Sequence, residues 1–196
     1  SFRVLSVNVG NLDEVNEGPC PVHPYLGGLC SMAQELYIAE QLASLRPDIA
    51  IIGEVVDPTR CTEDTWTGDP DRVCTGATER VPYEQVRRLM GPDYTISCDD
   101  RLHSDCAAVL TNRVTLMGCE AGQLCLGGNE TPPHSEACSG IGGHTSVSRI
   151  GAQLDGRALN IVVAHPKNAT SEQTDPCRLA QYREMFEELV DERPAL

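Results

Sequence analysis

The chain has 196 residues and a formal net charge of −14, with 40% hydrophobic and 4% aromatic residues. This length suffices for one domain with a sizeable core, and the low aromatic content requires a mainly aliphatic core. A surface this acidic offers nucleic acid no general electrostatic attraction. A phosphate-bearing substrate would therefore need a bound cation or a few arginines gathered at the binding site. No stretch reaches the roughly 20 apolar residues that a membrane-spanning helix needs.

Residues 2–9 alternate in polarity and are rich in valine, which predicts a strand. Residues 32–45 place apolar side chains mostly on one face, which predicts an amphipathic helix. Residues 49–56 form an unbroken apolar run, typical of a strand that is covered on both faces. Residues 57–80 are polar and predict a loop.

Residues 82–90 predict a short helix that starts at a proline. Three further strands are predicted at 94–98, 106–111 and 114–119.

The last part of the chain predicts a long loop, a hairpin and a helix. Residues 119–144 are rich in glycine and cysteine, and we expect a loop pinned by disulfides. Residues 146–154 and 157–165 predict a β-hairpin whose turn is Asp155–Gly156. Residues 177–192 predict a final amphipathic helix.

Ten cysteines are the strongest compositional signal. Their even number and wide spacing are typical of a disulfide framework, which predicts a secreted, extracellular protein from an oxidising compartment. Zinc binding is the competing interpretation, but it favours paired C-x-x-C motifs, and the sequence contains none. Spacing does not determine the connectivity, and the simplest local pairs are Cys20–Cys30, Cys61–Cys74 and Cys119–Cys125.

Three polar residues lie at positions where the predicted strands would otherwise be apolar: Asn8, Glu54 and His165. A carboxylate at the end of a buried strand is costly unless it is paired or bound to a cation, and hard divalent ions take carboxylate and amide oxygens. A histidine at a strand end can move a proton near neutral pH. Each residue also has a structural explanation: Asn8 as a turn former, Glu54 as an ion-pair partner, and His165 as a satisfied, partly buried side chain.

The stretches FRVLSVNVGN, RPDIAIIGEV and NIVVAHPKN, followed by CRLAQYREMFEEL, resemble the endonuclease/exonuclease/phosphatase superfamily. Asn8 corresponds to the asparagine of the family's first strand, Glu54 to its metal-binding glutamate, and His165 to the histidine that ends a later strand. Arg178 and Gln181 correspond to an Arg-x-x-Gln pattern on a helix, where we expect them to be structural.

The resemblance extends to two further residues and includes one departure. Secreted deoxyribonucleases of the family have a phosphate-approaching arginine before the histidine strand, matched by Arg149, and an acid that pairs with the histidine, for which Asp105 is the nearest candidate. Asp99 and Asp100 are weaker candidates for that acid, while Arg149 and Asp105 are otherwise explained as an exposed strand residue and a turn former. The departure is Gly53, where the family usually has glutamine before the metal-binding glutamate.

The resemblance implies an α/β (α+β) fold: a four-layer α-β-β-α sandwich of two packed mixed sheets with helices outside. Residues 1–196 would form the N-terminal part of a single such domain, because the family's Gly-Asp-x-Asn and terminal Ser-Asp-His motifs do not occur in them. Without a C-terminal segment, the inner faces of the sheets would expose a large apolar area. We expect that segment either as a separate chain after proteolytic cleavage or as sequence beyond these residues.

The function that the resemblance implies is secreted, divalent-metal-dependent phosphodiester hydrolysis, most similar to that of a DNA or RNA endonuclease. Glu54 and Asn8 would hold Mg²⁺ or Mn²⁺, with Ca²⁺ as a further alternative; His165, oriented by Asp105, would act as acid or base, and Arg149 would bind phosphate. One alternative is a sphingomyelinase-like or other small phosphodiester or phosphomonoester hydrolase, which the low aromatic content supports little. Another is a non-catalytic family member that acts as a binding protein.

Overall fold

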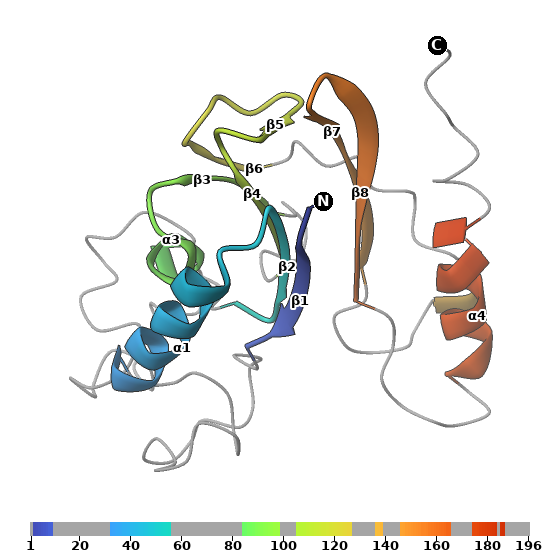
Figure 1. The fold of residues 1–196 in the computed structure, drawn as a ribbon. Helices are drawn as coiled ribbons and strands as arrows, with labels where there is room; N and C mark the ends of the chain where they lie inside the picture. The colour runs from blue at the N-terminus through green and yellow to red at the C-terminus, as the bar shows by residue number, and fades with distance from the viewer. Residues whose placement is uncertain are drawn as a thin grey trace.

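The structure, a computed structural model, describes residues 2–9, 32–55, 84–98, 105–126, 136–138, 146–165, 174–183 and 185–186. Two β-sheets lie face to face between helical layers, with α1 (Met32–Leu45) and α3 (Glu84–Met90) outside one sheet (Figure 1). Helix α4 (Asp175–Arg183) lies on the far side of the other sheet (Figure 1). This arrangement confirms the α-β-β-α sandwich.

The larger sheet has five strands in the order β1-β2-β4-β3-β6 and is mixed, as predicted. Its strands are β1 (Val4–Asn8), β2 (Ile49–Gly53), β3 (Tyr94–Cys98), β4 (Cys106–Leu110) and β6 (Leu124–Leu126). Strands β1 and β2 are parallel, with Asn8 opposite Gly53, whereas β4 runs antiparallel to β2 and begins opposite Ile52. The carboxyl ends of β1 and β2 and the start of β4 therefore share one edge.

Helices α1 and α3 cover the outer face of this sheet and form the first core. Leu42 of α1 and Leu89 of α3 pack in the same cluster as Ile52 and Ile96 from the sheet. The carboxylate of Glu35 is only 2% exposed between the helices and pairs with the Arg88 guanidinium. Because an unpaired buried carboxylate is costly, this ion pair fixes α1 against α3.

The second sheet has three strands in the order β5-β7-β8: β5 (Val114–Leu116), β7 (Ser146–Leu154) and β8 (Arg157–His165). The predicted hairpin is confirmed, including its turn, where Asp155 and Gly156 have φ of 50° and 77°. Two left-handed residues are what a type I′ hairpin turn requires. Both described strand pairs of this sheet are antiparallel. For β7 and β8 the reason is the two-residue turn, which can join only antiparallel neighbours.

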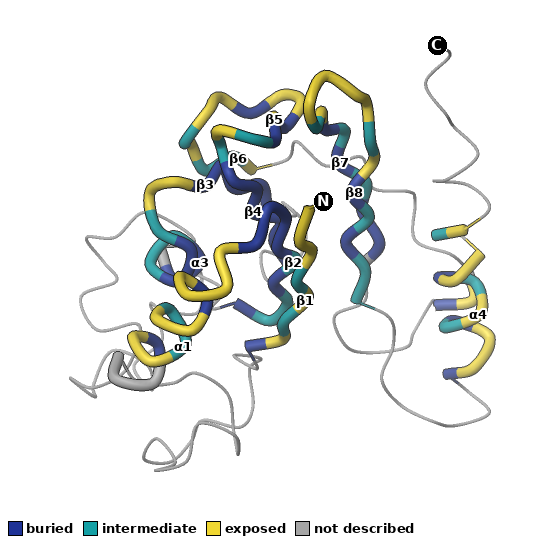
Figure 2. The backbone as a smooth tube through the Cα atoms, in the orientation of Figure 1, coloured by how far each residue is buried: buried dark blue, intermediate teal, exposed yellow. Residues whose placement is uncertain are grey.

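The second core fills the space between the two sheets. Val109 of β4, Val114 of β5, and Ile150 and Val163 of the hairpin are each at most 1% exposed. Figure 2 shows burial concentrated in β4 and the middle of the hairpin, whereas β1 is exposed or half-buried for most of its length. The aliphatic core expected from the low aromatic content is therefore the one observed.

The predicted loop at 119–144 contains two short elements, β6 and a 3₁₀ turn, η3 (Glu136–Cys138). A strand as short as β6 has too few residues to show a recognisable alternation, and it forms because it pairs with β3 in parallel. The predicted strand 49–56 ends earlier, at Gly53. No helix in the described ranges is long and apolar enough to cross a membrane.

Three disulfides join the six cysteines of the described residues: Cys98–Cys106, Cys119–Cys125 and Cys138–Cys177. The predicted pair Cys119–Cys125 is confirmed, whereas Cys20–Cys30 and Cys61–Cys74 lie outside the described residues. The first bridge links directly opposed residues of β3 and β4, and the third ties η3 to α4.

Replacing Cys98 and Cys106 together by alanine is expected to lower the free energy of unfolding by roughly 2–3 kcal/mol, because the unfolded chain regains the entropy that a closed loop removes. The two residues are eight positions apart and both fully buried. Urea unfolding of wild type and double variant under oxidising conditions measures the difference. Equal unfolding free energies would contradict the expectation.

Candidate active site

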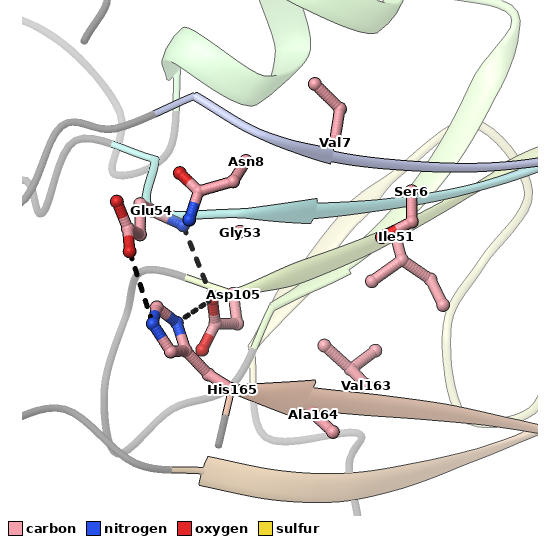
Figure 3. Close-up of a pocket in the computed structure, with 10 residues that line it drawn as sticks. All are labelled: Ser6, Val7, Asn8, Ile51, Gly53, Glu54, Asp105, Val163, Ala164 and His165. Carbon is pink, nitrogen blue, oxygen red and sulfur yellow. Dashed lines mark hydrogen bonds and ion pairs between the residues drawn. The ribbon is translucent and has the colours of Figure 1, made fainter. Parts of the chain in front are cut away.

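Four polar residues from different strands meet at one edge of the sandwich. Asn8 ends β1, Glu54 follows β2, Asp105 precedes β4 and His165 ends β8. The register of the larger sheet brings the first three together, and the hairpin of the second sheet delivers His165 to the same edge. Figure 3 shows the side chains of Glu54, Asp105 and His165 directed toward one another, with Asn8 beside Glu54.

The imidazole of His165 lies between two carboxylates. Its Nδ1 is 3.1 Å from Asp105 Oδ1, and its Nε2 is 3.2 Å from Glu54 Oε1. The side chain of Asp105 is 2% exposed, whereas those of His165 and Glu54 are 13% and 14% exposed. Because the buried carboxylate of Asp105 accepts a hydrogen bond from Nδ1, it orients the ring so that Nε2 faces the more open side of the site.

The hydrogen bond that His165 Nδ1 donates to the Asp105 carboxylate raises the pKa of His165 above its ordinary value. Burial opposes this shift, while the negative charges of Asp105 and Glu54 add to it, so the net direction of the pKa change is upward. The environment of His165 therefore favours the imidazolium form more than water does.

Glu54 adopts a left-handed backbone conformation with φ of 58°, which is unfavourable for a residue with a side chain. Two contacts hold the chain in this conformation. The Glu54 backbone N–H lies 3.3 Å from Asp105 Oδ1, and the next residue, Val55, is 1% exposed in the first core. Strained residues persist only where their surroundings determine them, and they concentrate at functional sites. Here the strained turn ends β2 and places the Glu54 carboxylate at His165.

A pocket of about 320 Å³ opens at this edge, between β1, β2 and the end of β8 (Figure 3). No lysine or arginine of the described residues lines it, whereas the carboxylates of Glu54 and Asp105 and the imidazole of His165 do. An anionic phosphate entering such a pocket would need a bound cation to offset the carboxylates.

The donors available to a cation in this pocket are oxygens. The described residues contain no cluster of three or more histidine, cysteine, aspartate or glutamate side chains suited to a metal ion. Asn8 ends β1, and Glu54 directly follows its parallel neighbour β2, so together they offer one carboxylate and one amide. Mg²⁺ is commonly held by one or two protein oxygens together with water and substrate phosphate, so this donor set fits such an ion.

The structure brings together four of the five candidate residues: Asn8, Glu54, Asp105 and His165. It does not bring Arg149 to the site. Arg149 pairs with Val162, one position out of phase with the inward-facing Val163 and His165, so it lies on the outer face of the hairpin. Its position in a strand was predictable, but the face it occupies depends on the hairpin register relative to the core.

One pocket residue escaped the sequence-based prediction although a signal for it existed. Ser6 lies two positions before Asn8 in β1, and alternate strand residues share a face, so Ser6 lines the pocket beside Asn8. Gln181 of the predicted Arg-x-x-Gln pattern is 2% exposed on α4, and Arg178 pairs with Asp175 on the same helix, away from the pocket.

The two packed sheets with helices outside have a fold that is also seen in solved structures of other proteins. Similar solved structures are those of TDP2 (tyrosyl-DNA phosphodiesterase 2). A humanized D. rerio TDP2 with 14 mutations gives a TM-score of 0.58 at 15% identity, over 98% of this chain and 61% of that one. D. rerio TDP2 complexed with a single-strand DNA product gives 0.56 at 15% identity, over 98% and 56%.

TDP2 from C. elegans gives a TM-score of 0.56 at 14% identity, over 98% of this chain and 44% of that one. The chain therefore spans about three fifths or less of the length of these structures. No protein-family model matches the sequence, and no curated protein matches it. At these identities the likeness establishes the fold.

Replacing Glu54 by glycine is expected to leave the protein about 1 kcal/mol more stable than replacing it by alanine, because glycine adopts positive φ without strain. Urea unfolding of both variants measures the difference. The same two substitutions at Glu40, an exposed residue of α1, provide the control and should show the opposite order, since glycine is the poorer helix former. If the alanine variant were the more stable one at both positions, the backbone at Glu54 would not be strained.

Stability is expected to depend on pH through His165. Because the pKa of His165 is raised in the folded protein, its contribution to stability is complete below about pH 6.5, its unfolded value, and is lost as the pH rises through the folded pKa. As the pH rises from about 6.5 through the folded pKa, the free energy of unfolding should fall in wild type and should fall less in His165→Gln.

The cause assigned to the pKa shift can be tested separately. An NMR titration of Asp105→Asn should show a lower pKa of His165 than in wild type, and an unchanged pKa would contradict the assigned cause.

Proposed function

We propose that this chain forms the N-terminal part of a secreted, divalent-metal-dependent phosphodiester hydrolase that cleaves nucleic acid. The observation that carries the proposal is the acidic edge pocket, in which one histidine lies between two carboxylates and no basic side chain of the described chain is present. Such a pocket repels a phosphate diester unless a cation is bound, and it holds a proton donor for the leaving group.

Glu54 and Asn8 would hold the ion, which we propose to be Mg²⁺ or Mn²⁺, with Ca²⁺ as the alternative. When bound, the ion neutralises the phosphate and stabilises the negative charge that develops on it. The strained turn at Glu54 supports this assignment, because it directs a carboxylate into the pocket instead of into solvent.

His165 would supply the proton. Asp105 accepts from Nδ1 and keeps the ring fixed, so that Nε2 is the nitrogen presented to the pocket. The raised pKa of His165 favours the imidazolium, whose Nε2 proton can pass to the oxygen of the leaving group. Asp105 acts by orienting the ring. Arg149 has no part in this scheme, because it lies on the outer face of the hairpin.

Nucleic acid is the substrate that the fold comparisons favour, since one similar structure, D. rerio TDP2, is complexed with a single-strand DNA product. A net charge of −14 disfavours long-range attraction of DNA, so binding would depend on contacts at the pocket and its bound ion. The three disulfides of the described residues support an oxidising, extracellular location.

A C-terminal segment would complete the domain, either within one chain or as a separate chain after cleavage. Strands β1 and β8 are the outermost strands of their sheets on the side of the pocket. Val4 of β1 is 57% exposed, although it lies opposite Ile49, which is 4% exposed. An apolar residue left open beside a buried one supports a missing covering layer. By the family resemblance, that segment carries the Gly-Asp-x-Asn and Ser-Asp-His groups.

The test uses the complete protein with plasmid DNA and a single-stranded oligonucleotide, in Mg²⁺ and in excess chelator. Wild type should cleave only with the metal, and Glu54→Gln and His165→Ala should each lose activity by roughly a hundredfold or more, since each removes a group at the reacting phosphate. Glu40→Gln on the exposed face of α1 is the matched control and should remain active.

Titration calorimetry with Mn²⁺ gives a reading that does not depend on turnover, and Glu54→Gln should weaken binding of the ion. Equal activity of wild type and both site variants would exclude this site. Inactivity of wild type on every nucleic acid would redirect the substrate search to sphingomyelin and small phosphoesters. Inactivity on those as well would support a binding protein.

A further inference from the structure

The backbone conformation at Gly53 does not require a glycine. Among the described glycines those with positive φ are at other positions, so Gly53 adopts a conformation open to any residue. Its surroundings supply a different reason. A Cβ at this position would lie 3.2 Å from Asp105 Oδ1, closer than nine in ten real Cβ contacts, so the carboxylate would have to give way by a few tenths of an ångström. The missing side chain therefore provides space for the carboxylate of Asp105.

The oxygen that approaches Gly53 is also the one that organises the site. Asp105 Oδ1 lies 3.1 Å from His165 Nδ1 and 3.3 Å from the backbone nitrogen of Glu54. Both distances are at or beyond the upper part of the normal hydrogen-bond range. A displacement of Oδ1 by a few tenths of an ångström would therefore weaken both contacts.

Asp105 has little freedom to move as a whole. It directly precedes Cys106, which pairs with Ile52 in the sheet and is bonded to Cys98. The Asp105 side chain is also 2% exposed, so it is enclosed on most sides. If the space at Gly53 were filled, the carboxylate would have to rotate, and rotation would take Oδ1 away from His165 Nδ1 and the Glu54 backbone nitrogen.

We propose that Gly53 is a positioning residue, which allows Asp105 to lie against the end of β2 and thereby orients His165. The inference rests on the proposed function insofar as His165 transfers a proton there.

The chain provides a matched control for testing this role. Gly151 in β7 also has an ordinary φ, and a Cβ there would lie 3.2 Å from its nearest neighbour, Met117 Cγ. That neighbour belongs to Met117, which is 54% exposed, has its Cβ 3.4 Å away and does not line the pocket. Gly53→Ala and Gly151→Ala thus each add a methyl group 3.2 Å from its nearest neighbour, but only the methyl group at position 53 contacts a residue of the candidate site.

The experiment compares both variants with wild type in the complete protein, by ¹⁵N NMR of the His165 imidazole at one fixed pH and by steady-state kinetics. Gly53→Ala is expected to shift or remove the signal of a protonated Nδ1 and to lower kcat by roughly tenfold to a hundredfold, with KM nearly unchanged. Gly151→Ala should leave both readings as in wild type. An unchanged His165 signal in Gly53→Ala would overturn the inference.

The double variant Gly53→Ala/Asp105→Ala keeps the test decisive if Gly53→Ala does not fold. When the carboxylate is absent, the added methyl group has nothing to displace, so the double variant should fold and give the same His165 signal as Asp105→Ala alone. Failure of the double variant to fold, where Asp105→Ala folds, would overturn the inference. The NMR comparison is independent of turnover, so an inactive wild type would count against the proposed function and not against the role of Gly53.

Discussion

The contact between Asp105 and His165 is the interaction on which the site depends, because it joins the two sheets at the edge where the strands end. Asp105 belongs to the larger sheet and His165 to the hairpin of the smaller one. Their 3.1 Å contact is possible only when the core between the sheets is packed, since Val109 and Val163 set the separation of the two strands. The aliphatic core therefore determines the geometry of the site as well as its stability.

The same contact explains the electrostatic character of the pocket. A buried carboxylate needs a partner, and His165 supplies one through Nδ1 while its Nε2 reaches Glu54. The imidazolium is then favoured by both acids. Among the described residues that line the pocket, two carboxylates and one imidazolium give an excess of one negative charge, which would attract a cation.

Much of the fold could be predicted from local patterns. The helix at 32–45 and the hairpin with its Asp155–Gly156 turn were predicted correctly, because side-chain periodicity and turn chemistry act over a few residues. Strand β6 was missed because three residues carry no usable period, and it exists through its pairing with β3. Of the site, Asn8, Glu54 and His165 were recognisable as polar residues in apolar strands, whereas the acid that meets His165 could be placed only with a family resemblance.

By itself, the sequence determined which strands and helices form, that the core is aliphatic, and which strand ends carry polar groups. The tertiary structure decided which of these groups meet. Asp105 comes within reach of His165 across 60 positions of sequence, whereas Arg149 faces away although it lies only 16 positions before His165. The reason is that the face of a strand residue depends on register against distant strands, and a shift of one position reverses it. The space at Gly53 is likewise invisible in the sequence, because it is defined by a carboxylate that approaches from another strand.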